Sequence, residues 1–193
     1  MGSLAIAPAV AGLLVPGRPA LSPLIGVKVP LWGGFTGKGR FSLRLWTPRP
    51  KMTKEEWAAK VPALKRAVDT AHESHRHVRA KVWHDGEKFL QQPDVYKRHG
   101  LALVRFPPNS GDLNPIETVW AWLRRDLALR EQDDFAANRQ LSVAQFRQRA
   151  AQILKGYEAR APGQQWSPLE KLVRGMPRRL ARCKARRYGR CGK

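Results

Sequence analysis

Acidic residues are scarce in this chain, and the first of them is Glu55. Any site that needs carboxylates must therefore draw them from positions after residue 54. Over the whole sequence 36 Lys and Arg stand against 15 Asp and Glu, a formal net charge of +21. A polyanionic partner such as nucleic acid explains this positive charge best, and a membrane surface explains it less well. The alternative is a basic surface that only keeps the protein in solution.

Cysteines and long apolar runs are also scarce. The two cysteines, Cys183 and Cys191, are too few for a disulfide scaffold and lack the CxxC pairs of a zinc site, so they indicate ordinary thiols. No run of 18 apolar residues predicts a membrane span. The apolar segment 4–15 contains Pro8 and no basic residues precede it, so we expect no secretion signal. With 42% hydrophobic residues and seven Trp the chain can bury a real core.

The order of predicted elements indicates an α/β fold. Residues 1–26 have no clear period and are expected to be a poorly ordered leader. Two β-favouring runs, 27–32 and 41–46, flank the glycine-rich segment 33–39 and predict a hairpin. Thr53 and Glu56 form a capping box for a helix that Pro62 must kink or divide.

Strands and helices then alternate, which is typical of parallel βα units. We expect them over the following residues: strands at 81–85 and 101–106, the second one buried, and helices at 88–98, 114–130, 143–157 and 168–182. The predicted domains are the leader 1–26, an α/β unit at 27–135, and C-terminal helices with a basic tail at 136–193.

Two carboxylates stand where an α/β protein binds ligands, at the ends of strands and the loops that follow them. Asp85 ends a predicted strand, and Glu117 lies in the first turn of the helix after the next one. Brought together, such oxygens suit Mg²⁺. Each also has a structural alternative, because Asp85 before Gly86 can make a turn and Glu117 can complete a capping box with Asn114.

A longer motif favours the catalytic alternative. Residues 107–120 read PPNSGDLNPIETVW. They closely resemble the segment P-P-x-S-P-D-L-N-P-I-E-N-x-W, which carries the last catalytic acid of mariner-superfamily transposases. Gly111 replaces a proline and Thr118 an asparagine. The resemblance implies that Glu117 is the third acid of a DDE triad.

Other segments are similar to the same family. Residues 31–34, LWGG, resemble its V-W-G-G segment, and residues 172–180, LVRGMPRRL, resemble its closing S-M-P-R-R-L element. Residues 83–86, WHDG, stand where the family has Q-D-N, which implies that Asp85 is the second acid, although Gly86 departs from the pattern. The likeness runs from about Val27 to the C-terminus.

The resemblance implies a mixed RNase H-like sheet flanked by helices, followed by a helical basic tail. It implies DNA cleavage and joining with Mg²⁺ or Mn²⁺ held by Asp85 and Glu117, transposon ends and target DNA as partners, and a homodimer. It places the protein in the nucleus of a eukaryote or the cytoplasm of a bacterium. The family's first acid should lie on a strand before Val27, where no carboxylate exists. We therefore expect a front-truncated, inactive enzyme with an incomplete sheet and weakened metal binding.

The C-terminus offers a function that needs no catalysis. From Lys171 onward the chain has ten basic residues and no acid. Such a tail binds phosphates without reading sequence. The alternative to a transposase is thus a non-catalytic nucleic-acid-binding protein, and a basic protein of a ribonucleoprotein is a third hypothesis that leaves the 107–120 motif unexplained. The candidate DNA-binding residues are Lys171, Arg174, Arg178, Arg179, Arg182, Lys184, Arg186, Arg187 and Arg190.

Overall fold

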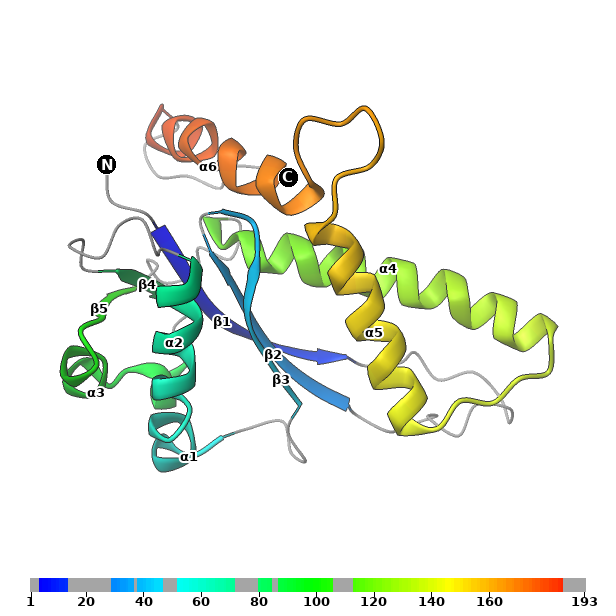
Figure 1. Ribbon diagram of the computed structural model, residues 1–193, viewed down its shortest axis with the longest axis horizontal. Coiled ribbons are helices and arrows are strands. Elements are labelled where there is room, and N and C mark those ends of the chain that lie inside the picture. The colour runs from blue at the N-terminus through cyan, green and yellow to red at the C-terminus, as the bar shows by residue number, and fades with distance from the viewer. Residues whose placement is uncertain are drawn as a thin grey trace.

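The computed structural model describes residues 4–13, 29–36, 38–46, 52–71, 80–84, 87–105 and 113–185. In these ranges a mixed sheet lies between two groups of helices (Figure 1). The elements are β1 Leu4–Leu13, β2 Val29–Thr36, β3 Phe41–Trp46, α1 Lys54–Ala58, α2 Val61–Ala71, β4 Lys81–His84, the 3₁₀ turn η2 Lys88–Leu90, α3 Pro93–Arg98, β5 Ala102–Arg105, α4 Pro115–Ala136, α5 Val143–Glu158 and α6 Pro168–Ala185. No helix in the described ranges is long and apolar enough to cross a bilayer.

Within the described residues the sheet has five strands in the order β3-β2-β1-β4-β5. β1 pairs antiparallel with β2, and β2 pairs antiparallel with β3. On its other side β1 runs parallel to β4, which runs parallel to β5. The predicted α/β class is confirmed, and β1 is the central strand that joins an antiparallel hairpin to a parallel pair.

The structure corrects the expected leader and the expected gap in the sheet. Leu4–Leu13 is not a leader but the central strand, with neighbours on both sides. The sheet is therefore complete at that position. Pro8 lacks an N–H, and it lies inside the register shift between Ile6 and Ala9. A bulge is one of the few places in a sheet where proline costs no ladder hydrogen bond.

The predicted hairpin is confirmed, but its turn is shorter than expected. Gly33 and Gly34 continue β2 and pair with β3, and Gly33 also pairs with Ala9 of β1. The chain reverses between Thr36 and Arg40, where the N–H of Thr36 donates to the carbonyl of Arg40 at 2.8 Å. Pairing with β3 holds both glycines in the ladder, and Gly33 is also paired on the β1 side.

One face of the sheet is covered by α1, α2, η2 and α3. Trp32 from β2 and Val82 from β4 are buried there beside Trp57, Leu64 and Phe89. The Trp57 indole donates to the Tyr96 hydroxyl at 2.9 Å. The expected capping box forms at Thr53 and Glu56, and the helix divides before Val61, which leaves Pro62 in a first turn.

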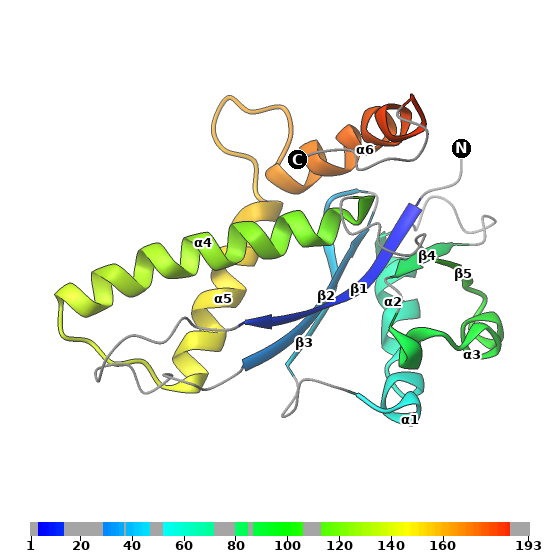
Figure 2. The same ribbon diagram turned by 180° about the vertical axis from the view of Figure 1, so that it is seen from behind.

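The opposite face is covered by α4, α5 and α6 (Figure 2). The odd-numbered β2 residues Val29, Leu31 and Phe35 point to this side, whereas Trp32 points to the other, as the two-residue period of a strand requires. α4 contributes Ile116, Trp120 and Leu123 to this core at helical spacing. α5 and α6 complete it with Phe146, Ala150, Ile153, Leu154, Tyr157, Leu169 and Leu172.

Two boundaries differ from the sequence-based expectation. The C-terminal helices pack in the same core as the sheet, so the expected boundary at residue 135 does not divide the protein into two separately packed units. The boundary would also fall inside α4, which runs to Ala136. The strand expected to be buried, β5, lies at the sheet edge, and Ala102, Leu103 and Val104 are half-buried. The apolar run of β5 is long enough for a central strand, but its position is set by pairing order.

Candidate functional site

Glu117 lies in the first turn of α4, as the sequence predicts. Asn114 is the N-cap residue: its side-chain oxygen accepts from the N–H of Ile116 at 3.4 Å, and its carbonyl accepts from the N–H of Glu117 at 3.2 Å. Pro115 takes the first helical position, where a missing N–H costs nothing. Asn114 and Pro115 are buried and Glu117 is half-buried, so the motif fixes its carboxylate at the positive end of a helix.

Asp85 lies outside the described residues. The strand before it, β4, ends at His84, whose side chain is fully buried. β4 lies between β1 and β5 in the sheet. The distance between the two predicted acids stays untested.

β1 is the parallel neighbour of β4, paired from Leu4 opposite Lys81 to Ile6 opposite Trp83. Its sequence, LAIAPAVAGL, contains no carboxylate. Among the residues that the structure describes, no three His, Cys, Asp or Glu come together as metal ligands. A hard divalent cation needs several oxygen ligands, and of the two predicted acids only Glu117 lies among the described residues.

Most of the predicted DNA-binding residues lie on α6. Its buried side is formed by Leu169, Leu172, Met176 and Cys183. Lys171, Arg174, Arg178 and Arg182 recur at steps of three and four, are exposed, and form one stripe on the opposite side. Arg179 is half-buried and Lys184 is exposed away from this stripe, whereas Arg186, Arg187 and Arg190 lie outside the described residues.

The C-terminal end of α6 contacts the segment that leads into α4. Leu113, directly before the cap residue Asn114, is buried together with Cys183 of α6. Both views show α6 passing over the start of α4 (Figures 1 and 2). The basic helix and the turn that carries Glu117 are thus neighbours.

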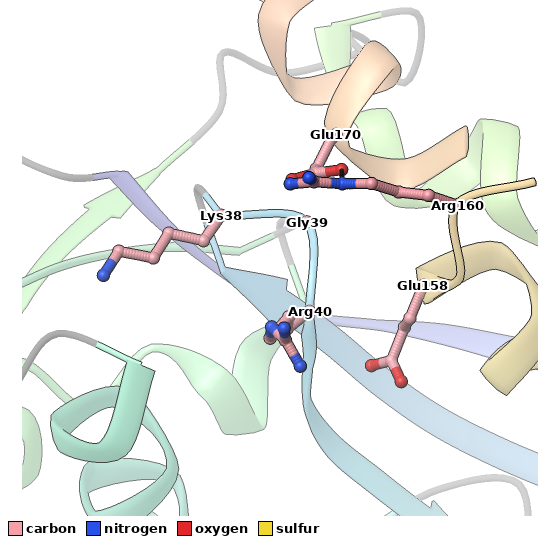
Figure 3. Close-up of a pocket in the computed structure, with 6 residues that line it drawn as sticks. All are labelled: Lys38, Gly39, Arg40, Glu158, Arg160 and Glu170. Atoms are coloured by element: carbon pink, nitrogen blue, oxygen red, sulfur yellow. Dashed lines mark hydrogen bonds and ion pairs between the residues drawn. The ribbon is translucent and has the colours of Figure 1, made fainter. Parts of the chain in front are cut away.

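Sequence reasoning missed a second group of charged residues around the β2–β3 turn. A cavity of about 370 Å³ is lined by Lys38, Gly39, Arg40, Glu158, Arg160 and Glu170 (Figure 3). Arg160 donates to Glu170 through Nε at 3.0 Å and Nη2 at 2.7 Å. The Arg160 guanidinium, together with the N–H of Ser167, lowers the pKa of Glu170 to about 2. The sequence feature that could have indicated this charged group is the Lys38-Gly39-Arg40 turn between two predicted strands.

An aromatic side chain links this group to α6. The guanidinium carbon of Arg174 lies 3.3 Å from the ring centroid of Trp166, and that of Arg160 lies 5.7 Å away. Stacking on an indole occupies the face of a guanidinium and leaves its N–H edge for acceptors such as phosphate oxygens. The start of α6 is therefore an ordered cationic surface.

Sequence comparison identifies no relative of this chain: no family model matches it, and no curated protein matches it. Solved structures give a different result. The fold is similar to the Mos1 transposase catalytic domain bound to raltegravir with Mg, with a TM-score of 0.66 over 96% of this chain and 84% of that one, at 13% identity. A crystal structure of the catalytic domain of Mos1 mariner transposase gives 0.61, over 95% of this chain and 81% of that one, also at 13% identity.

A longer structure from the same protein, a Mos1 transposase paired-end complex with the left transposon end, gives a TM-score of 0.68 at 13% identity. It is matched over 98% of this chain and 56% of that one. At this identity the likeness establishes the fold and no more. The chain has the fold of a mariner-type transposase catalytic domain, as the 107–120 motif predicts, and that fold spans nearly all of it.

Proposed function

We propose that this chain is a transposase-type domain that binds duplex DNA through α6 and does not cut it. Asp85 and Glu117 are the second and third acids of a DDE-type site, and the first acid has no counterpart. The observation that carries the proposal is the combination of the fold with the two sides of α6. One side of the helix packs on the core beside the Glu117 turn, and the other presents a cationic stripe.

The stripe suits the regular charge of a nucleic-acid backbone. At about 1.5 Å per residue, Lys171 to Arg182 span roughly 16 Å. Duplex DNA carries one negative charge per ~1.7 Å of its axis, so several phosphates lie within reach of the four cations. Because α6 is held by Leu169, Leu172 and Met176, the cations are presented by a fixed helix. Phosphate contacts of this kind carry no sequence information, so binding is expected to be weakly selective.

The proposed lack of cleavage rests on β1. Two-metal phosphoryl transfer needs ions held firmly enough to align the attacking and leaving oxygens. The strand beside β4 supplies Leu, Ile, Ala, Pro, Val and Gly. Glu117 and Asp85 leave a second ion with too few anionic ligands.

Binding can be tested with Arg178→Gln combined with Arg182→Gln. Both residues are exposed on the stripe, and removing two phosphate contacts should lower the slope of log K against log salt by about 1.8. Fluorescence anisotropy with a labelled duplex over a salt series measures the slope. The matched control is Lys60→Gln with Lys88→Gln, the same change of charge on exposed residues of the α1 and η2 region, far from α6. Equal slopes in the two double variants would refute the α6 surface.

Cleavage can be tested on a supercoiled plasmid and on a pre-cut transposon end with Mg²⁺ or Mn²⁺. Neither the parent nor Glu117→Gln should nick or join DNA. Metal-dependent nicking by the parent that disappears in Glu117→Gln would refute the proposed inactivity and assign Glu117 as a catalytic residue. The DNA-binding part of the proposal would stand in that case, because the salt series tests it separately.

A further inference from the structure

The β2–β3 turn is docked on the first turn of α6. Gly39 at its tip is buried and has a φ of +68°. A Cβ built on Gly39 would lie 2.6 Å from the backbone N of Glu170 and 2.9 Å from its Cα. Only glycine allows this approach, because those atoms belong to a helix backbone that cannot move aside. The turn and α6 are therefore one surface, although about 130 residues separate them in the sequence.

The two residues that flank Gly39 are both cationic and exposed. Lys38 extends from the turn away from the Arg160–Glu170 pair (Figure 3), and Arg40 follows Gly39 on the other side of the turn. Within the described part of the chain, no carboxylate forms an ion pair with either side chain. A solvated cation pair on a rigid turn keeps its counterions until a polyanion displaces them.

The acids nearby do not cancel this charge. Glu170 is held by two hydrogen bonds from Arg160 and one from the N–H of Ser167 at 2.7 Å, and it completes the capping box of α6 with the Ser167 hydroxyl. The remaining acid of the cavity lining is Glu158, with one negative charge. The positive charges around it are four: Lys38 and Arg40 at the turn, and Lys171 and Arg174 on the adjoining turns of α6. The surface is cationic on balance.

We propose that Lys38 and Arg40 form a second contact with the DNA backbone, which continues the α6 stripe so that both bind phosphodiester groups of one duplex. The inference rests on the proposed DNA binding and deepens it. The ligand chemistry is that of phosphodiester oxygens, because the available donors are one ammonium and guanidinium edges and no base-reading amide lies among the cavity residues. Gly39 is a positioning residue that keeps the two cations beside α6.

The test compares Lys38→Gln combined with Arg40→Gln against Lys60→Gln combined with Lys88→Gln in the same salt series. The turn variant should lower the slope by about 1.8, as the loss of two phosphate contacts requires, and the control should keep the parent slope. All four residues are exposed, so thermal unfolding should be unchanged. Equal slopes in the two variants would overturn the second contact while leaving the α6 stripe in place.

Gly39→Ala tests the positioning separately from the charge. The added methyl group collides with the backbone of Glu170, so the turn must leave α6, and the affinity for the duplex should fall several-fold at unchanged net charge. Parent-like affinity in Gly39→Ala would overturn the positioning role. If Gly39→Ala does not fold, the glutamine pair decides alone. A parent chain that binds no duplex at any salt concentration would overturn both this inference and the proposed function, whereas loss of binding only in the α6 variant overturns this inference alone.

Discussion

Asp134 is a buried carboxylate that joins α4 to α5. Its side chain is 5% exposed and accepts from Arg149, through Nη1 to Oδ2 and through Nη2 to Oδ1, the latter at 3.1 Å. Arg139 adds an ion pair from Nε to Oδ1 at 3.1 Å. The hydrogen bonds from Arg149 lower the pKa of the Asp134 carboxyl, which identifies the charged form as the one that stabilises the fold.

Asp134→Asn should therefore destabilise the protein by about 1.5–3 kcal/mol at neutral pH, because it weakens charged hydrogen bonds to a partly buried arginine. Since the folded pKa is depressed, this stability is present above the unfolded pKa of about 3.9 and is lost as the pH falls through the folded value. Urea unfolding at several pH values measures the difference. Asp133→Asn, the exposed neighbour, is the control and should stay near the parent at neutral pH. A difference that does not shrink in acid would contradict the assignment.

At the scale of elements, the cap of α4 serves both structure and site. Asn114 is 3% exposed and its side chain satisfies the N–H of Ile116 in the turn that holds Glu117. Asn114→Ala should cost about 1 kcal/mol of unfolding free energy, and Asn114→Asp should recover most of it, because aspartate caps helices equally well. Chemical denaturation of the three proteins makes the comparison. An aspartate variant as unstable as the alanine variant would show that the motif asparagine acts through something other than capping.

Local signals predicted the helices well. The capping box of Thr53 and Glu56 and the N-cap at Asn114 could be predicted because a cap involves residues only two or three positions apart. Gly100 follows α3 with a φ of +68°, the left-handed conformation in which helices commonly end. The expected helix 88–98 is instead divided into η2 and α3. Pro93 has no N–H with which to continue a helix from the preceding residues, so it occupies the first position of α3.

At the scale of the whole molecule, the central strand is the feature on which the sheet depends. Ala5 of β1 pairs with Thr36 of β2 on one side and with Val82 of β4 on the other. Ala5→Pro removes a backbone N–H from the part of the central strand that is paired on both sides and should abolish cooperative unfolding, whereas Ala5→Ser keeps the N–H and should stay folded. Circular dichroism during a thermal melt distinguishes them. A proline variant that melts like the parent would mean that residues 4–13 are not required for the fold.

Some features of the fold and the site depend on residues that are close in the sequence, and others depend on residues that only the tertiary structure brings together. The sequence by itself determined the α/β class, the hairpin, the helix caps, the position of Glu117 in a first turn and the likeness to a mariner-type domain. Each of these depends on residues close together in the chain or on a contiguous motif. The basic character of residues 171–184 was also evident from the sequence, although not their arrangement as a stripe on a packed helix.

Only the tertiary structure decided which strand fills the centre of the sheet, that β5 lies at its edge, and that Lys38 and Arg40 adjoin α6. The place of Leu4–Leu13 at the centre of the sheet follows from its pairing with β2 on one side and β4 on the other, and its proline lies at a register shift, where a sheet tolerates it. The approach of Gly39 to Glu170 depends on how the hairpin and α6 pack on α4 and α5. The residue spacing within the hairpin or within α6 does not predict that contact, because the packing free energy depends on how well the two surfaces fit each other.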